Sequence, residues 1–291
     1  YPPYNARKKY LLKNLSEEVD DLEDEEENIL FHADPRNDDK NKSSTEFSLE
    51  KKTSLYDHRF NAVFDALKSS GAQTVCDLGC AGGQFVSRYV ASGAFSRVGG
   101  MDISQRAIFR LRKMIKPKDK NIDLFVGSLT YFDRRLLEYE ALTLVEVIEH
   151  FEPWDLEMVE KVIFGATRPK TVIVTTPNFE YNQVFGMAPN KLRHTDHKFE
   201  FTRAEFQKWC EKISSSFGYE TSISGIGYNH MDFGRASQMC VFKTINANYA
   251  TDIAIEEANR ICFDSCIDPS KLTKEELIKI QINYEEEMDN T

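Results

Sequence analysis

Residues 74–86 read TVCDLGCAGGQFV: an apolar stretch, a glycine-rich turn and a second apolar stretch. This order predicts a strand, a tight turn and a helix, because glycines are needed where the backbone turns sharply and passes close to a ligand. A second expected strand ends at Asp102, about 20 residues past Gly83, where a carboxylate can accept hydrogen bonds from both hydroxyls of a ribose. The combination predicts a nucleotide-type cofactor site, with an ordinary strand–helix turn as the simpler alternative.

The acidic residue before the turn distinguishes between cofactors. In a dinucleotide-binding turn, glycines in the pattern G-x-G-x-x-G hold a pyrophosphate at the start of a helix. Here Asp77 and Gly79 precede the glycine pair, and the Asp77 carboxylate would repel phosphate. An acidic group suits a cationic cofactor, which favours S-adenosylmethionine, with its amine and sulfonium, over NAD.

Strand-like and helical segments alternate on both sides of this turn. Beyond the first strand, the expected strands cover residues 97–101, 123–126, 141–148 and 171–176, and the expected helices cover residues 54–70, 84–91, 104–114 and 153–166. Such alternation predicts an α/β fold with a doubly wound, mostly parallel sheet. Ligands bind such sheets at the carboxyl ends of the strands. Gly79, Asp102, Ser128, Glu146 and Pro177 fall at those ends.

The alternation stops after the fifth strand. Residues 178–201 form a loop long enough to suggest a function. Thr202-x-x-Glu205 is a capping box that begins a helix running to about residue 215. Residues 219–227 and 238–243 predict two closing strands, an antiparallel pair at the edge of the sheet.

Residues 146–150, EVIEH, place three potential metal ligands within one short segment. Glu149 and His150 are adjacent, so both can face one ion only where the backbone turns, as it does at the end of a strand. His197 offers another imidazole from the later loop. Two carboxylates and two imidazoles suit a divalent cation of intermediate hardness. The alternative is an acidic turn with a histidine that has a structural partner.

Composition limits the class of protein. The 291 residues allow one α/β domain with extensions, and no apolar run approaches the roughly 20 residues needed to cross a bilayer. Cys76 and Cys240 lie in strand-like runs and are expected to be buried thiols, without a disulfide framework, in a reducing compartment. Cys262-x-x-x-Cys266 has no second pair to complete a metal site.

Charge divides the chain into three parts. Nine acidic residues lie within residues 17–27, and without them the formal net charge of −10 would be −1, so a local basic face is compatible with the rest. The expected organisation is an acidic, disordered arm over residues 1–50, a catalytic domain over residues 51–245 and a helical, acidic tail over residues 246–291.

Three segments resemble the catalytic domain of small-RNA 3′-terminal 2′-O-methyltransferases: residues 146–150 (EVIEH), 174–182 (VTTPNFEYN) and 193–203 (RHTDHKFEFTR). Glu-x-x-Glu-His occurs in many class I methyltransferases, whereas Asp-His-Lys-Phe-Glu behind Thr-Pro-Asn is specific. The resemblance covers about residues 54–243. It implies the class I methyltransferase fold, a Rossmann-like sheet of seven strands with antiparallel edge strands.

The resemblance also implies an activity and its residues. The enzyme would transfer a methyl group from S-adenosylmethionine to the 2′-hydroxyl of the 3′-terminal nucleotide of small single-stranded RNAs. The implied residues are Glu146, Glu149, His150 and His197 for Mg²⁺ or Mn²⁺, and Asp77, Gly79, Asp102 and Ser128 for S-adenosylmethionine. Arg193, Lys198 and Arg203, with Lys191, are expected to bind RNA phosphates, against the alternative of a solvated basic loop.

Further expectations concern location and partners. We expect a cytoplasmic monomer without membrane contact, in RNA granules if it serves RNA silencing, with an Argonaute- or Piwi-type protein presenting the RNA. Two residues depart from the family pattern. Ala81 stands where the family often has the middle glycine of the turn, and Phe201 stands where the family usually has tryptophan. The alternatives are a quinone-type small-molecule O-methyltransferase, an RNA-end repair methyltransferase acting on cleaved tRNA, and a non-enzymatic RNA-binding scaffold.

Overall fold

Seven strands form the sheet of the described chain. They are β1 (Thr74–Leu78), β2 (Arg97–Asp102), β3 (Ile122–Val126), β4 (Ala141–Val145), β5 (Thr171–Pro177), β6 (Tyr219–His230) and β7 (Gly234–Thr244). The computed structural model describes residues 53–115 and 121–245. The predicted arm, the predicted tail and the pair Cys262 and Cys266 lie outside the described residues.

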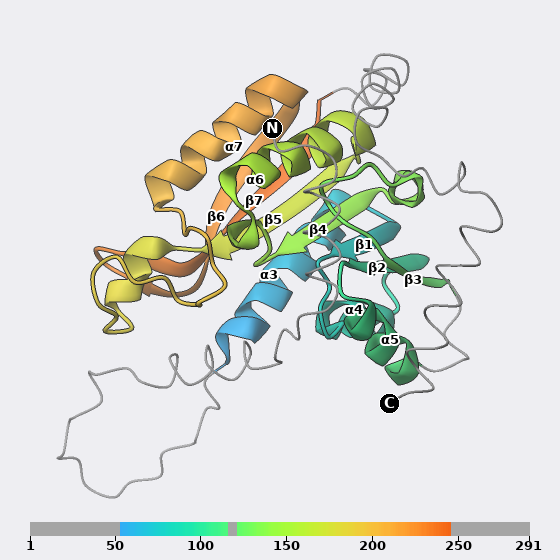
Figure 1. The fold of residues 1–291 in the computed structure, drawn as a ribbon, viewed down its shortest axis with the longest axis horizontal. Helices are drawn as coiled ribbons and strands as arrows, with labels where there is room; N and C mark the ends of the chain where they lie inside the picture. The colour runs from blue at the N-terminus through green and yellow to red at the C-terminus, as the bar shows by residue number, and fades with distance from the viewer. Residues whose placement is uncertain (1–52, 116–120, 246–291) are drawn as a thin grey trace, which may run out of the picture. The chain divides into compact units, whose positions relative to one another are not determined.

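The strand order is β3-β2-β1-β4-β5-β7-β6 (Figure 1). Strands β1 to β5 pair in parallel, and β7 pairs antiparallel with both β5 and β6. This confirms the predicted doubly wound sheet with an antiparallel pair at one edge. The strand order reverses at β1, which lies between β2 and β4, and ligands of such sheets bind at the carboxyl ends beside that reversal.

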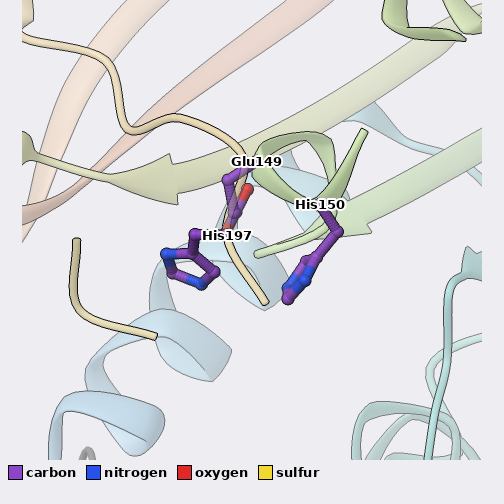
Figure 2. A group of neighbouring side chains, drawn as sticks. All are labelled: Glu149, His150 and His197. Atoms are coloured by element: carbon purple, nitrogen blue, oxygen red, sulfur yellow. The ribbon is translucent and has the colours of Figure 1, made fainter. Parts of the chain in front are cut away.

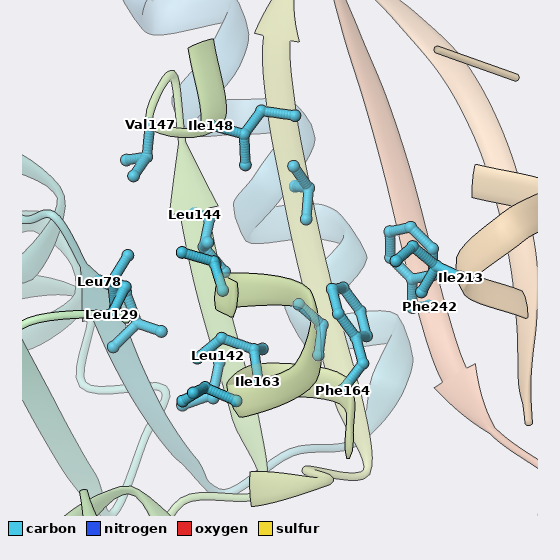
Figure 3. Close-up of a cluster of buried hydrophobic side chains, with 14 of the residues drawn as sticks. Leu78, Leu129, Leu142, Leu144, Val147, Ile148, Ile163, Phe164, Ile213 and Phe242 are labelled. Atoms are coloured by element: carbon cyan, nitrogen blue, oxygen red, sulfur yellow. The ribbon is translucent and has the colours of Figure 1, made fainter. Parts of the chain in front are cut away.

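Helices cover both faces of the sheet (Figure 1). They are α3 (Leu55–Ser70), α4 (Gln84–Ser92), α5 (Gln105–Met114), α6 (Pro153–Glu160) and α7 (Arg203–Phe217). Successive strand residues point to opposite faces, so Ile173 belongs to the core cluster of α3, α4 and α5, whereas Val172 and Val174 belong to the cluster of α6 and α7. Figure 3 shows part of this second cluster, with Leu142, Phe164 and Ile213 among its members. Burial on both faces explains why the parallel strands are continuous apolar runs.

The predicted helix ends are confirmed where caps define them. Ser54 caps α3 by accepting a hydrogen bond from the Asp57 amide, and Gly71 ends that helix with φ of 76°. The capping box of Thr202 and Glu205 begins α7. Such caps satisfy amide groups that have no partner within the helix.

Three expected elements differ in the structure. Strand β4 ends at Val145 rather than at residue 148, because Glu146 takes φ of 53° and a short 3₁₀ helix, Ile148–His150, follows. The helix expected over residues 153–166 is α6 followed by a π-helix, Lys161–Thr167. The loop after β5 contains a 3₁₀ turn, Phe179–Gln183.

Two smaller expectations concern cysteines and membranes. Cys76 and Cys240 are buried free thiols as predicted, and so are Cys80 and Cys210. Among the described helices, none combines the length and apolar character needed to span a bilayer.

Candidate active site

Four predicted cofactor residues lie at the carboxyl ends of β1, β2 and β3. Asp77 is 4% exposed and accepts a hydrogen bond of 2.6 Å from the Thr143 hydroxyl. Burial raises the pKa of Asp77 to about 7. A buried carboxylate whose charge is costly fits a cationic ligand group, because a positive charge would stabilise its ionised form.

Backbone hydrogen bonds fix the Asp102 carboxylate at the end of β2. Its Oδ1 accepts from the Ser104 amide at 2.7 Å, and its Oδ2 accepts from the Ala81 amide at 2.8 Å. The Gly127 amide donates to the Asp102 carbonyl at 3.0 Å, which brings Ser128 next to Asp102. The predicted set of Asp77, Asp102 and Ser128 is therefore grouped along one edge of the sheet.

The glycine-rich turn needs glycine at position 79. Gly79 has φ of 69°, and a Cβ atom there would lie 2.8 Å from Cγ2 of Val147. Ala81 has φ of 42° although it carries a methyl group, and a non-glycine residue in this left-handed region costs about 1–2 kcal/mol. The Ala81 side chain is exposed, so its methyl group meets no crowding.

Glu149, His150 and His197 form one group of potential metal ligands. One ligand atom from each lies within 4.8 Å of the others (Figure 2). The 3₁₀ helix after β4 supplies the backbone turn that lets adjacent Glu149 and His150 face the same point. The Lys198 amide donates to the Glu149 carbonyl at 2.8 Å, which holds His197 beside them.

The Glu149 carboxylate is fully buried and incompletely paired. Oε2 accepts a hydrogen bond of 3.1 Å from the Thr176 hydroxyl, whereas Oε1 has no hydrogen-bond partner among the described residues. Burial, and then the charge of Glu146, raise the pKa of Glu149 to about 8. A buried, unpaired carboxylate oxygen beside two imidazoles fits a divalent cation, which would supply the missing positive charge.

Glu146 lies outside this three-residue group. Its carboxylate is held by Arg59 of α3, with Nη2 to Oε2 at 2.8 Å, and by the Thr175 hydroxyl at 2.8 Å. The prediction of Glu146 as a fourth metal ligand therefore stays a prediction. Its φ of 53° is a strained conformation for a non-glycine residue, and such strain is concentrated at functional sites.

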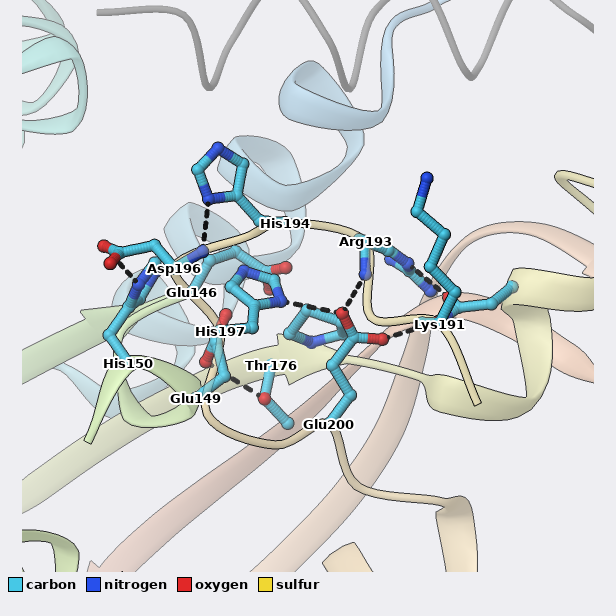
Figure 4. A network of polar contacts seen from close by, with 12 residues as sticks. Glu146, Glu149, His150, Thr176, Lys191, Arg193, His194, Asp196, His197 and Glu200 are labelled. Carbon is cyan, nitrogen blue, oxygen red and sulfur yellow. Dashed lines mark hydrogen bonds and ion pairs between the residues drawn. The ribbon is translucent and has the colours of Figure 1, made fainter. Parts of the chain in front are cut away.

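The two imidazoles each contact a carboxylate (Figure 4). Nδ1 of His150 lies 3.4 Å from Asp196, and this contact, despite burial, lowers the pKa of Asp196. Nδ1 of His197 lies 2.7 Å from Glu200. Burial opposes ionisation of Glu200, but the hydrogen bond from His197 and the charge of Arg193 hold its pKa below the ordinary value.

The predicted contact of Arg193 with RNA phosphates stays a prediction, and the burial of this residue argues against it. Arg193 is 6% exposed. Its Nη2 donates to the carbonyls of Asn178 at 2.7 Å and Ala236 at 2.8 Å, and its Nε donates to Asn182. A guanidinium enclosed in this way fixes the loop and leaves little surface for a phosphate.

The other predicted RNA-binding residues are accessible. Lys191 and Lys198 are exposed on the loop that carries His197. Arg203 is also exposed, but its guanidinium pairs with Glu180. The two lysines therefore remain better candidates than Arg203 for phosphate contacts.

Sequence reasoning missed Arg59, although the helix pattern contained a signal. Leu55, Arg59, Val63 and Leu67 are the buried residues of α3 and recur at every fourth position. A charged residue in an otherwise apolar buried stripe requires a buried partner, because an unpaired buried charge is costly. That partner is Glu146, which lies 87 positions later in the chain and could not be identified by spacing.

The chain is similar to known proteins along the same segment. A family described as a methyltransferase domain matches residues 75–170. The small RNA 2′-O-methyltransferase of Xenopus tropicalis is 33% identical over 204 residues, which are 66% of this chain and 55% of that protein. The methyltransferase domain of bacterial CtHen1 is 40% identical with a TM-score of 0.60, over 66% of this chain and 99% of that domain.

The chain belongs to the small RNA 2′-O-methyltransferase family. The structure of the small RNA methyltransferase HEN1 agrees, with 30% identity and a TM-score of 0.62 over 70% of this chain and 28% of that one. The chain spans about half the length of the curated relatives it matches. Family membership confirms the class I methyltransferase fold that the residues and motifs predicted.

Asp102→Ala is expected to weaken binding of S-adenosylhomocysteine to this family member about tenfold or more. The change removes a carboxylate positioned for ribose hydroxyls, and hydrogen bonds to charged groups contribute roughly 1.5–3 kcal/mol each. Isothermal titration calorimetry measures the affinity. Asp65→Ala, which removes an exposed carboxylate of α3, is the control and should leave the affinity unchanged. Equal affinities in the Asp102 variant and the wild type would disprove the cofactor placement.

Proposed function

We propose that this chain transfers a methyl group from S-adenosylmethionine to the 2′-hydroxyl of the 3′-terminal nucleotide of small single-stranded RNAs, with a divalent metal ion. Family membership supports the methyl transfer and the RNA class. The observation that supports a metal-dependent reaction most directly is the Glu149 carboxylate. It is buried with one oxygen unpaired, and it lies beside His150 and His197.

The residues of the chain have separable tasks in this proposal. A bound divalent cation lowers the pKa of a coordinated hydroxyl, and a ribose 2′-hydroxyl needs that help at neutral pH. Glu149, His150 and His197 hold the cation, with Glu146 as the predicted fourth ligand. Asp77 and Asp102 orient the cofactor, so the methyl group and the acceptor oxygen meet in line. Two nitrogen ligands favour Mn²⁺ over Mg²⁺ on ligand preference alone.

The proton of the 2′-hydroxyl has two candidate acceptors. His194 accepts a hydrogen bond from the Asp196 amide at its Nδ1, at 3.2 Å, so the neutral ring carries its proton on Nε2. His194 can therefore take the proton only at Nδ1, once that hydrogen bond is released. The His194 ring lies 5.7 Å from the His197 ring, measured between centroids. A water molecule is the second candidate.

RNA binding is proposed to rest on phosphate contacts rather than on base reading. Lys191 and Lys198 are exposed on the loop that carries His197, so phosphates preceding the terminal nucleotide can reach them. Such binding should weaken with salt and depend little on base sequence. Presentation by an Argonaute- or Piwi-type protein, a monomeric state and a cytoplasmic location remain parts of this proposal.

The test combines labelled S-adenosylmethionine, Mn²⁺ and a short RNA with a free 3′ end. The expected product is RNA whose terminal ribose resists periodate, because a 2′-methyl group removes the vicinal diol that periodate cleaves. A quinone-type phenol and a cleaved tRNA half are the competing substrates. Faster transfer to the phenol would support the small-molecule alternative. Faster transfer to the tRNA half would support the repair enzyme, and no transfer to any substrate would support the scaffold protein.

A further inference from the structure

A buried carboxylate lies directly behind the His197 imidazole. The Glu200 side chain is 0% exposed, and its Oε1 lies 2.7 Å from Nδ1 of His197. The same Oε1 accepts the Arg193 amide at 2.6 Å, and Oε2 accepts the Asn182 side-chain amide at 2.6 Å (Figure 4). A backbone N–H group and a side-chain N–H group thus both donate hydrogen bonds to this one carboxylate.

We propose that Glu200 is a positioning residue that fixes the tautomer and the orientation of His197, so that Nε2 faces Glu149 and His150. This inference rests on the proposed metal-dependent function. A carboxylate surrounded by donors acts as an acceptor, so the proton of the neutral imidazole lies on Nδ1 and the lone pair on Nε2. Metal-binding histidines commonly donate their other N–H to a carboxylate, which fixes the ring and raises its basicity.

Arg193 and Asn182 hold Glu200 in place. Nε of Arg193 donates to Asn182 Oδ1 at 2.7 Å, and the Asn182 amide in turn donates to Glu200. The Arg193 guanidinium is anchored on the carbonyls of Asn178 and Ala236, at the end of β5 and in β7. The loop of residues 178–201 is therefore connected to the sheet through a chain of hydrogen bonds that ends at His197.

A purely structural role for Glu200 makes a different prediction from a positioning role. If Glu200 only stabilises the loop, its replacement lowers the melting temperature, and the folded protein binds metal as before. If Glu200 fixes the tautomer, a glutamine at position 200 can donate its amide N–H to Nδ1 of His197. The imidazole proton then moves to Nε2, the nitrogen that faces the other ligands.

The first measurement uses the wild-type protein without metal. Two-dimensional ¹⁵N–¹H spectra of the histidine side chains identify which ring nitrogen carries the proton, after assignment with His197→Gln. We expect the Nδ1–H tautomer for His197. An Nε2–H tautomer in the wild type would overturn the inference without any reference to enzyme activity.

The second measurement compares Mn²⁺ affinity by electron paramagnetic resonance in the wild type, Glu200→Gln and Glu180→Gln. Glu180 is a matched control because it is a loop carboxylate that pairs with Arg203 and belongs to neither ligand group. We expect Glu200→Gln to bind Mn²⁺ about 10–100-fold more weakly, with S-adenosylhomocysteine affinity unchanged, and Glu180→Gln to match the wild type.

The outcomes separate the two proposals. Equal Mn²⁺ affinity in Glu200→Gln and the wild type would overturn the positioning role and leave the proposed metal-dependent function standing. A wild type that binds no Mn²⁺ would overturn the metal-dependent function, and the positioning role with it. If Glu200→Gln does not fold, the tautomer of the wild type still decides the inference.

Discussion

Glu149→Ala is expected to lower the rate of methyl transfer by roughly a thousandfold or more, while the fold and cofactor binding survive. The physical reason is that Glu149 supplies the buried carboxylate of the Glu149–His150–His197 group, and a metal ion contributes several kcal/mol to such a reaction. Single-turnover transfer to a short RNA, with and without EDTA, measures the effect. Full activity of the variant, or of the wild type in EDTA, would refute the metal-dependent mechanism.

Two variants separate loss of the ligand from loss of the fold. Glu157→Ala, which removes an exposed carboxylate of α6, should leave the transfer rate unchanged. Glu149→Gln should melt at a higher temperature than the wild type at pH 8 in EDTA. Without metal, the pKa of Glu149 is raised from 4.5 to about 8, so its contribution to stability is complete below about pH 4.5 and is lost as the pH rises through 8. A neutral amide avoids that loss.

The sheet and its cofactor end could be predicted from sequence because their signals are local. Parallel strands buried on both faces are continuous apolar runs, and each βα turn places its polar residue directly after the run. Asp77, Gly79, Asp102 and Ser128 are predicted cofactor residues for this reason. Strand β4 was predicted three residues too long, because Val147 and Ile148 continue the apolar pattern while the backbone leaves the sheet at Glu146.

The contacts around the candidate metal ligands could not be predicted, since the residues that make these contacts are distant in sequence. The sequence neighbours of Arg193 indicate a loop cation, yet its Nη2 donates to the Ala236 carbonyl, 43 residues away. Glu146 is predicted as a metal ligand together with Glu149, but spacing gives no sign of Arg59, which pairs with Glu146 from a helix that precedes the first strand. Residue type and spacing therefore predicted the candidate ligands, whereas the tertiary structure showed which of them lie together and which other residues hold them in place.

The same set of charges leads to the second large prediction, which concerns the end of the RNA. The carboxylates of Glu146, Glu149, Asp196 and Glu200 lie at the site. Two of them, Asp196 and Glu200, contact imidazoles. A 3′-phosphate would bring about 1.5–2 further negative charges beside them. The proposed cation would offset part of this charge, so the exclusion of a phosphorylated end rests mainly on geometry. A 3′-phosphate esterifies the 3′ oxygen and removes one of the two vicinal hydroxyls that could meet the ion.

An RNA with a free 3′-hydroxyl is therefore expected to be methylated at least about a hundredfold faster than the same RNA with a 3′-phosphate. Internal riboses should not react, because every internal 3′ oxygen carries a phosphate. A 2′-deoxy end lacks the acceptor oxygen and should be inert. A 3′-deoxy end keeps the acceptor but loses the second hydroxyl that could meet the ion, and should react far more slowly.

Rates for the four RNAs, with the methyl group mapped by nuclease digestion and mass spectrometry, provide the measurement. Equal rates for the 3′-hydroxyl and 3′-phosphate RNAs, or methyl groups on internal riboses, would contradict end recognition even if methyl transfer itself is observed.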